Sequence, residues 1–315
     1  MSKKLKNIAI LGAGTMGVGI GLLFAMKDYP VKLIYSCEQD KTSNPLGRMH
    51  ESLKILSNNG VVDRSKMDAI MANVSTTDNL EEGATFADII FECIIEDLSI
   101  KQDFFKKLDE MCTEDTVLAS NTSAISITEI AETSENKSRI IGTHFWNPPF
   151  LIPLVEVIKT EFVSEDTVNR VHELLEEAGK KPVIVNKDVP GFLANRMQHA
   201  LFREALYIIE QGIAEPSAVD DAIKYGFGMR LGIMAPVGVM DMGGLDLTYA
   251  IHEYLFKDLC NDTKPAAILS QKLSEGKLGF KSGEGLMTWT QEKIAQERKH
   301  LTEDLIKVAR ALDRL

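Results

Sequence analysis

The stretch IAILGAGTMG, residues 8–17, decides the fold of this chain. Its apolar first half predicts a buried β-strand, and the small and apolar residues from Val18 to Met26 predict a helix directly after the glycines. Three glycines spaced Gly-x-Gly-x-x-Gly between a strand and a helix are typical of a dinucleotide-binding turn. The first glycine permits the sharp turn, the second lets the backbone approach a pyrophosphate, and the third lets the helix pack on the sheet. The stretch therefore predicts a nucleotide cofactor whose phosphates lie at the helix N-terminus.

The bulk composition is that of an ordinary globular enzyme. A length of 315 residues predicts two domains, and the net charge of −11 argues against nucleic-acid and membrane-surface partners. No stretch approaches a membrane span, and the start of the chain lacks the long apolar region of a signal peptide, so we expect a cytoplasmic protein with a small-molecule substrate. Because the cysteines show no C-x-x-C spacing, we expect reduced thiols and no metal site at Cys37, Cys93, Cys112 or Cys260.

The first half of the chain alternates between strand-like and helix-like patterns. Apolar strand runs separated by amphipathic segments indicate a mostly parallel sheet covered on both faces, which is a doubly wound α/β fold of the Rossmann type. The β-branched runs disappear after Asp188, and the remaining patterns predict helices. We therefore predict a cofactor-binding domain over residues 1–187 and a helical domain over residues 188–315. The expected strands are Asn7–Leu11, Val31–Ser36, Val74–Thr76, Asp88–Glu92, Thr116–Ser120, Arg139–His144, Leu154–Ile158 and Pro182–Val185.

Two ionisable residues, His144 and Glu156, stand close together in the sequence near the end of the predicted sheet. Prolines between them exclude a continuous helix, so a loop joins two strands and can return Glu156 to His144. A carboxylate bonded to one imidazole nitrogen orients the ring and stabilises the imidazolium after proton uptake. The pair is therefore a candidate general base for an alcohol. A structural histidine beside an unrelated surface glutamate is the alternative.

The chain resembles the 3-hydroxyacyl-CoA dehydrogenase family from Asn7 to about Trp289. The resemblance implies an NAD-dependent dehydrogenase that transfers a hydride from a 3-hydroxyl carbon, and a homodimer formed through the helical domain. It rests on several motifs in the same order along the chain: GAGTMG (12–17), Glu96 with Lys101, SNTSAISIT (120–128), HFWNPP (144–149), LVEVIKT (154–160), VPGFLANR (189–196), GGLDL (243–247) and KSGEG (281–285).

The resemblance implies a role for each matched residue. In the family the histidine of the HFxNP motif is the general base and the glutamate of the LVEV segment orients it, which points to His144 and Glu156. The second serine of SNTS and the asparagine of GFxxNR bond the substrate oxygens, which points to Ser123 and Asn195. A helix cap at Ser123 and a polar helix start at Asn195 are the alternatives. The implied cofactor contacts are Gly12, Ala13, Gly14, Thr15, Met16, Gly17, Glu96, Lys101, Asn121 and Lys281.

The end of the second predicted strand departs from the family pattern. An acidic residue usually stands there and holds the ribose 2′-hydroxyl of NAD. This chain has Tyr35 with Ser36 beside it, and the nearest acids are Glu38 and Asp40. No arginine adjoins the strand end in the sequence, so a site for the 2′-phosphate of NADP is missing too. We expect NAD, with Tyr35 and Ser36 at the adenosine end of the cofactor site.

Two further departures leave the substrate open. Fatty acyl-CoA members usually read HFFNPVPxMKLVE, whereas residues 144–156 here contain a double proline, a feature of relatives that act on free hydroxy acids, such as carnitine, gulonate and pyridine-alcohol dehydrogenases. The short PMGPFEL turn that is usual in the family is replaced here by the longer stretch from Gly228 to Pro236. Arg230 in this stretch is a candidate for binding a substrate carboxylate in a bidentate manner, with a surface or interdomain ion pair as the alternative. We expect an L-3-hydroxyacyl-CoA as substrate. A free 3-hydroxy acid or carboxylate-bearing alcohol is the alternative, and a catalytically idle structural relative is the third interpretation.

Overall fold

The computed structural model describes residues 4–315 and divides them into two compact units. The first unit extends to Asn195, and the second spans Arg196–Arg314. Residues 1–3, which begin the first predicted domain, lie outside the described residues. The boundary predicted after Lys187 falls earlier in the chain and stays a prediction.

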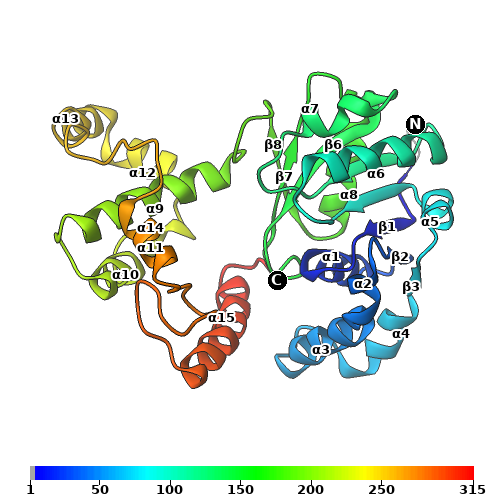
Figure 1. The fold of residues 1–315 in the computed structure, drawn as a ribbon, viewed down its shortest axis with the longest axis horizontal. Coiled ribbons are helices and arrows are strands. Elements are labelled where there is room, and N and C mark those ends of the chain that lie inside the picture. Colours follow the sequence, from blue (N-terminus) through cyan, green and yellow to red (C-terminus); the bar gives the residue numbers. More distant parts are fainter. Residues whose placement is uncertain (1–3) are drawn as a thin grey trace. The chain divides into compact units, whose positions relative to one another are not determined.

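The first unit is built on one eight-stranded sheet (Figure 1). The strand order is β3-β2-β1-β4-β5-β6-β7-β8, and its first six strands have the order of a doubly wound nucleotide-binding fold. All neighbouring strands are parallel except the pair β6 and β7. The strands are β1 (Ile8–Leu11), β2 (Val31–Ile34), β3 (Val74–Thr77), β4 (Ile89–Glu92), β5 (Val117–Ser120), β6 (Ile140–Phe145), β7 (Leu154–Ile158) and β8 (Lys181–Val185).

The antiparallel pair follows from the length of its connection. Residues 146–153 alone join β6 to β7, and a parallel pair needs a crossover of a dozen residues or more. The short loop therefore forces β7 to run back along β6, and β8 continues beside β7 in the same direction. The predicted mostly parallel α/β architecture is confirmed.

Helices cover both faces of this sheet, and neighbouring residues of β2 show it. A Cβ atom added to Gly21 of helix α1 would lie 3.1 Å from Leu33, whereas one added to Gly83 of helix α5 would lie 2.2 Å from Ile34. Because successive strand residues point to opposite faces, α1 and α5 lie on opposite sides. The helices of this unit are α1 (Thr15–Ala25), α2 (Glu38–Thr42), α3 (Pro45–Asn58), α4 (Met67–Ala72), α5 (Leu80–Phe86), α6 (Leu98–Met111), α7 (Ile127–Ile130) and α8 (Glu165–Glu177).

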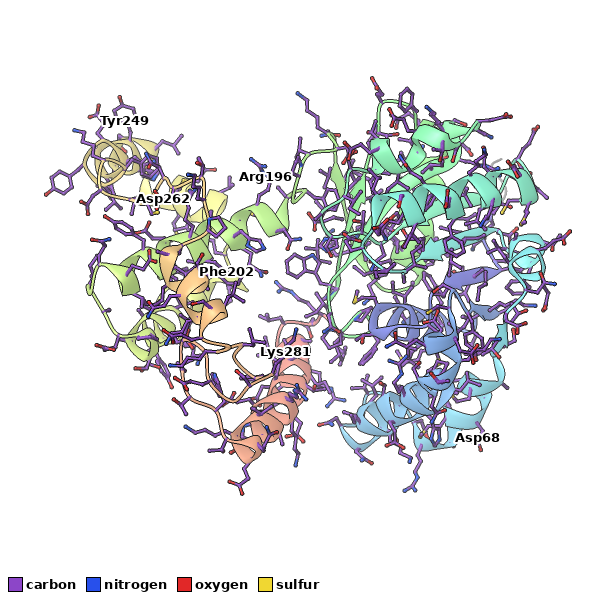
Figure 2. All side chains as sticks on the ribbon, in the orientation of Figure 1. Asp68, Arg196, Phe202, Tyr249, Asp262 and Lys281 are labelled. Atoms are coloured by element: carbon purple, nitrogen blue, oxygen red, sulfur yellow. The ribbon has the colours of Figure 1, made fainter. Side chains whose placement is uncertain are left out.

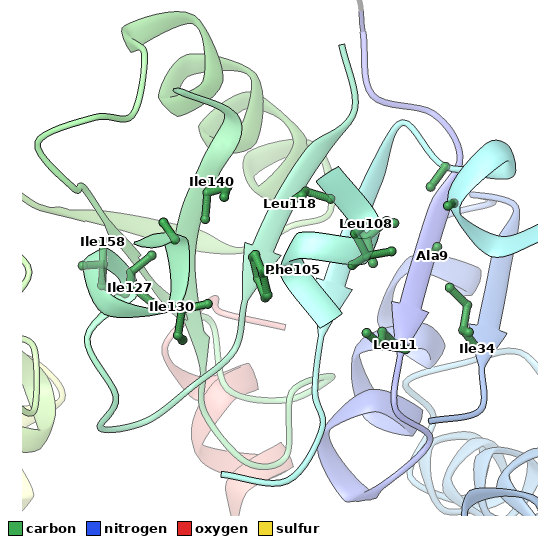
Figure 3. Packing of buried hydrophobic residues seen from close by; sticks show 14 of the residues in the cluster. Ala9, Leu11, Ile34, Phe105, Leu108, Leu118, Ile127, Ile130, Ile140 and Ile158 are labelled. Carbon is green, nitrogen blue, oxygen red and sulfur yellow. The ribbon is translucent and has the colours of Figure 1, made fainter. Parts of the chain in front are cut away.

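A continuous apolar core lies between the sheet and helices α6 and α7 (Figure 3). Phe105 and Leu108 of α6 and Ile127 of α7 are buried against strand residues such as Leu11 and Leu118. Burial of apolar surface on this scale stabilises the sheet by roughly 25 cal/mol per Å². The carboxyl ends of the strands, which carry the polar residues, are therefore anchored on a rigid base.

The second unit consists of helices, and most of them bury none of their side chains. The described exceptions are Val219 of α10 and Ile294 and Ile306 of α15. Figure 2 labels Phe202 on α9 and Tyr249 on α13, both exposed. No helix among residues 4–315 is both long enough and apolar enough to span a membrane. The helices are α9 (Ala194–Glu210), α10 (Pro216–Tyr225), α11 (Gly228–Leu231), α12 (Pro236–Gly243), α13 (Leu245–Leu255), α14 (Ala267–Ser274) and α15 (Gln291–Ala311).

Candidate active site

The three glycines of the turn between β1 and α1 differ in what a side chain would meet at each position. Gly12 has φ +99°, and a Cβ atom there would lie 2.8 Å from the carbonyl oxygen of Cys93. A Cβ atom on Gly17 would lie 1.9 Å from the carbonyl oxygen of Gly12, so the turn cannot close with a larger residue. Gly14 has a common φ of −69°, and a Cβ atom there would meet no atom within 4 Å. The fold therefore requires Gly12 and Gly17 but not Gly14.

The open space at Gly14 lies at the N-terminus of α1. Gly14 is the N-cap residue of this helix and no side chain caps it, so its first N–H groups lack the usual side-chain acceptor. Free N–H groups, the positive end of the helix dipole and an uncrowded approach are what a pyrophosphate needs. The residues of the turn fit a dinucleotide cofactor. Arg48 of α3 also reaches the turn, because its guanidinium donates a hydrogen bond to the carbonyl oxygen of Ala13.

His144 and Glu156 are brought together by the register of the antiparallel pair. In that register His144 of β6 stands directly opposite Glu156 of β7. The His144 Nδ1 atom lies 2.7 Å from Glu156 Oε2, and both side chains are buried. The ring is also packed beside Phe192, with centroids 5.7 Å apart. The geometry is that of an imidazole oriented by a carboxylate, which leaves Nε2 as the nitrogen able to exchange a proton with a ligand.

Glu156 is a fully satisfied buried carboxylate. Its Oε1 atom accepts hydrogen bonds from the backbone N–H groups of Leu193 and Ala194, each at 2.9 Å. Its Oε2 atom accepts one from Trp146 Nε1 at 3.2 Å in addition to the contact with His144. Burial raises the pKa of Glu156, but the hydrogen bonds with His144, Ala194 and Leu193 outweigh burial and lower this pKa below its ordinary value. The side chain is therefore an anion at neutral pH.

The two predicted substrate-binding residues meet at the start of α9. Asn195 Nδ2 donates to the carbonyl oxygen of Ser123 at 3.3 Å, so the helix start lies against the loop after β5. Glu96 holds the same loop, because its Oε1 atom accepts a hydrogen bond from the backbone N–H of Ser123 at 3.1 Å and one from Thr122 Oγ1. The Ser123 hydroxyl has no protein partner among the described residues. It is available to a ligand.

Lys101 lies deeper than the sequence indicates. Its ammonium is 2.6 Å from Glu92 Oε1 and 3.3 Å from Glu96 Oε2, and the side chain is 1% exposed. Glu92 is buried as well and also accepts a hydrogen bond from Ser120 Oγ at 2.6 Å. Sequence reasoning noted Glu92 only as a strand end, although an acid closing an apolar strand was a signal. The Lys101–Glu92 pair ties the ends of β4 and β5 to α6, and the predicted cofactor contact of Lys101 stays a prediction.

The predicted cofactor residue Asn121 fixes the neighbouring strand. Its Oδ1 atom accepts a hydrogen bond from the backbone N–H of Phe145 at 2.9 Å, and its own N–H donates to the carbonyl oxygen of Glu92 at 2.9 Å. These contacts join the carboxyl ends of β4, β5 and β6. The Nδ2 group of Asn121 is left for other partners.

At the end of β2 the structure adds two residues to those predicted. Asp40 Oδ2 accepts hydrogen bonds from the N–H and the hydroxyl of Ser36, at 2.8 and 2.7 Å. An acid thus stands beside the strand end although Tyr35 occupies the usual position. Arg48, distant in sequence, comes near through its contacts with Ala13 and with Ser43 Oγ. Both contacts are made by its Nη2 group, and its buried Nε atom has no hydrogen-bond partner among the described residues.

Lys281 and Arg230 belong to the second unit and are both exposed. Lys281 is labelled in Figure 2, and Arg230 lies on α11. The roles expected for them toward the cofactor and the substrate stay predictions. Among residues 4–315 no group of three His, Cys, Asp or Glu side chains is placed to hold a metal ion.

The loop between His144 and Glu156 is held by hydrogen bonds from a buried lysine. Lys180 donates hydrogen bonds to the carbonyl oxygens of Pro149 and, at 2.9 Å, Ile152. Pro149 packs against α1, since a Cβ atom added to Gly19 would lie 2.7 Å from it. Burial, together with the charge of Lys27, lowers the pKa of Lys180 to about 7. The loop is thus fixed both to Lys180 and to α1.

The sequence matches the models of one family along most of the chain. The model of the 3-hydroxyacyl-CoA dehydrogenase NAD binding domain matches residues 7–189, and the model of the C-terminal domain of the same family matches residues 191–289. The chain belongs to the 3-hydroxyacyl-CoA dehydrogenase family, which confirms the resemblance seen in the motifs. It is an NAD-dependent oxidoreductase that acts on a CH–OH group.

Individual relatives differ in what they act on. The chain is 33% identical to a 5-formyl-3-hydroxy-2-methylpyridine 4-carboxylate 5-dehydrogenase of Mesorhizobium japonicum, over 98% of this chain and 99% of that protein. It is 36% identical to a probable 3-hydroxybutyryl-CoA dehydrogenase of Bacillus subtilis, over 92% of this chain and 99% of that protein. A crystal structure of a dehydrogenase of the pyridine compound superposes with a TM-score of 0.90 at 32% identity, covering 98% of this chain and 99% of that one.

The glycine turn yields a test that separates cofactor binding from folding. We expect Gly14→Val to abolish NAD binding, because the side chain fills the open space at the helix N-terminus, and to change the free energy of unfolding by less than about 1 kcal/mol. Gly17→Ala is the matched control and should unfold the turn, since its Cβ atom overlaps the Gly12 carbonyl. Calorimetric titration with NAD and urea denaturation measure the two effects. Full NAD affinity in Gly14→Val would contradict the placement of the pyrophosphate.

Because of Lys180, we expect the free energy of unfolding to increase as the pH rises above 7. Because its pKa falls from the ordinary 10.5 to about 7 on folding, the unfolded chain binds a proton between these values that the folded chain lacks. Stability therefore rises with pH above 7, by at most about 1.4 kcal/mol per pH unit, and the contribution is absent in Lys180→Met. Urea denaturation at pH 7, 8 and 9 measures the difference in slope. Lys181→Met, at the exposed neighbouring position, is the control and should keep the wild-type slope.

Proposed function

We propose that the chain oxidises a hydroxyl-bearing carbon with His144 as the general base and Glu156 as the residue that orients it. The observation that carries this proposal is the 2.7 Å contact between His144 Nδ1 and the buried, anionic Glu156. His144 Nε2 takes the proton of the substrate hydroxyl, and the carboxylate stabilises the resulting imidazolium. The hydride leaves the same carbon, so a ketone or aldehyde forms and the atoms balance. NAD, when bound, is the hydride acceptor.

In this proposal Ser123 and Asn195 hold the substrate oxygen while it changes from hydroxyl to carbonyl. Their support is the contact between Asn195 Nδ2 and the Ser123 carbonyl, which brings the two polar side chains to one place. The Ser123 hydroxyl donates to the oxygen as its carbonyl character grows. Asn121, with its Nδ2 group free of the contact to Phe145, holds the nicotinamide end of the cofactor.

The adenosine end of NAD lies at the β2 terminus in this proposal. Asp40 supplies the negative charge that the family usually places on the strand, and Ser36 fixes its carboxylate. This acid accepts a ribose 2′-hydroxyl and repels a 2′-phosphate. Arg48 is turned to the glycine turn, because its Nη2 group donates to the Ala13 carbonyl oxygen and to Ser43 Oγ.

For the substrate we propose a small hydroxyl-bearing molecule with a free carboxylate. The end-to-end match to the pyridine carboxylate dehydrogenase, together with the double-proline loop, supports this class. A CoA substrate would in addition need cations for its phosphates, and two lysines of the segment after β2 are already paired with acids. Lys41 lies 2.8 Å from Asp78, and Lys54 lies 2.7 Å from Glu51. Arg230 is the residue proposed to bind the carboxylate.

An L-3-hydroxyacyl-CoA, the substrate expected from the sequence, is the second candidate. The 36% identity to a probable 3-hydroxybutyryl-CoA dehydrogenase over 92% of this chain favours it. The thioester carries no charge beside C3, so Arg230 has no role with this substrate. An idle structural relative, the third interpretation, predicts no turnover with either class.

We also propose a homodimer formed through the helical unit. Helices α9, α11, α12, α13 and α14 contain no buried residue in the single chain. Large apolar side chains such as Ile233, Tyr249 and Tyr254 are more than half exposed. Monomeric proteins rarely leave this much apolar surface in water, and a second copy of the chain would cover it.

The role of the base is tested by substitution at His144. We expect His144→Gln to lower kcat roughly 10²- to 10⁴-fold, which is the usual contribution of a general base, with NAD affinity unchanged. Glu156→Gln should lower kcat by a similar or smaller factor. NADH formation with the best substrate from a panel of free hydroxy acids and 3-hydroxyacyl-CoA thioesters gives kcat, and calorimetry gives NAD affinity. Near-wild-type turnover in His144→Gln would rule out this base.

The substrate class is tested at Arg230. With a carboxylate substrate, Arg230→Met should raise KM about 10- to 150-fold, because a charge-assisted hydrogen-bonded pair contributes roughly 1.5–3 kcal/mol. With acetoacetyl-CoA in the reverse direction the same substitution should leave KM within about twofold. Steady-state NADH kinetics on both substrate classes measure this contrast. Thioester turnover that is high and insensitive to Arg230→Met would replace our proposal by the second candidate.

A further inference from the structure

Trp146 makes a contact with the catalytic pair that its motif does not predict. Its indole Nε1–H group donates to Glu156 Oε2 at 3.2 Å, and the same oxygen receives His144 Nδ1 at 2.7 Å. The indole is half-buried, and its ring centroid lies 5.4 Å from that of His144 with the planes inclined by 58°. The fatty acyl-CoA members that the sequence resembles usually carry phenylalanine at this position, which has no donor. The hydrogen bond is thus specific to the tryptophan.

The Glu156 Oε2 atom is shared between the Trp146 indole and the His144 imidazole. A hydrogen bond to a carboxylate stabilises the anion and weakens it as an acceptor for other groups. The other oxygen of Glu156 already accepts two backbone N–H groups, so no part of the carboxylate is left to compensate. Among the described residues neither His144 nor Glu156 forms another ion pair, and the imidazole also contacts the apolar ring of Phe192. The indole is therefore the neutral side chain that donates to the oxygen shared with His144.

We propose that Trp146 is a positioning residue that, by donating to Glu156 Oε2, lowers the pH at which His144 becomes a competent base. The proposal rests on the proposed function of His144. The indole limits the stabilisation that Glu156 gives to the imidazolium, so the imidazole is free of its proton at lower pH. It also fixes the Oε2 atom on the His144 side, and the backbone donors of Leu193 and Ala194 fix Oε1.

The test is Trp146→Phe, which keeps an aromatic ring and removes the donor. We expect the acid-side midpoint of the kcat/KM profile to rise by roughly half a pH unit, which is about a threefold change in proton affinity. The kcat at high pH should stay within about threefold, because the base itself remains. Trp289→Phe is the matched control, since the only other tryptophan lies in the second unit against Phe280, and its profile should not move.

A measurement without turnover separates this proposal from the function on which it rests. The midpoint of the His144 imidazole titration, followed by NMR in the free protein and assigned by its loss in His144→Gln, should rise by the same amount in Trp146→Phe. An unchanged NMR midpoint overturns the role of Trp146, whatever the kinetics show. An NMR midpoint that moves while the kinetic midpoint stays shows that His144 does not limit the reaction, which overturns the catalytic part of the proposal and the proposed base with it.

A second variant covers a failure of Trp146→Phe to fold. Benzothienylalanine at position 146 has the shape of tryptophan with sulfur in place of the N–H group, so it retains the packing and removes the donor. We expect the same upward shift of both midpoints. A wild-type midpoint in this variant would assign the effect of Trp146→Phe to packing and overturn the proposal.

Discussion

The structure of the site depends on one buried carboxylate. Glu156 is wholly inaccessible to solvent and has four donors, which come from β6, from the turn after it and from the start of α9. A buried charge without partners costs several kcal/mol, and the four donors together compensate this cost. The same carboxylate stands at the N-terminus of α9, where a negative charge also stabilises the helix dipole. The orientation of His144 and the placement of Asn195 are therefore consequences of a single charge.

The antiparallel register brings the two side chains together with only a short loop between their strands. His144 and Glu156 are directly opposite each other across β6 and β7, so their side chains leave the sheet on the same face. A shift of one residue would send Glu156 to the other face and leave a charge in the apolar layer. The buried loop anchor at Lys180 fixes the connection between the two strands and thereby opposes such a shift.

Sequence reasoning recovered what depends on local pattern. The strand β7 has the predicted bounds, and each of the other strands differs from its predicted range by one or two residues at its ends. The glycine turn and the proximity of His144 to Glu156 were also predicted, because turn chemistry and short loops are local. Contacts between distant segments were not. Arg48 of α3 contacts Ala13, and Leu193 contacts Glu156. Both contacts join residues that are distant in the sequence, and no repeating pattern in the sequence indicates them.

The cofactor end of the site consists of backbone groups and the chemical end consists of side chains, and this difference bears on substrate specificity. At the cofactor end the turn offers backbone N–H groups and empty space at Gly14, which recognise a pyrophosphate in any dinucleotide. At the chemical end, in the proposed mechanism, His144 and Glu156 accept the proton of any suitably placed hydroxyl. Neither end distinguishes a thioester from a free acid. Substrate choice must therefore come from residues outside the sheet edge, and departures from the family pattern such as Arg230 and the double-proline loop are the places where this chain differs from its acyl-CoA relatives.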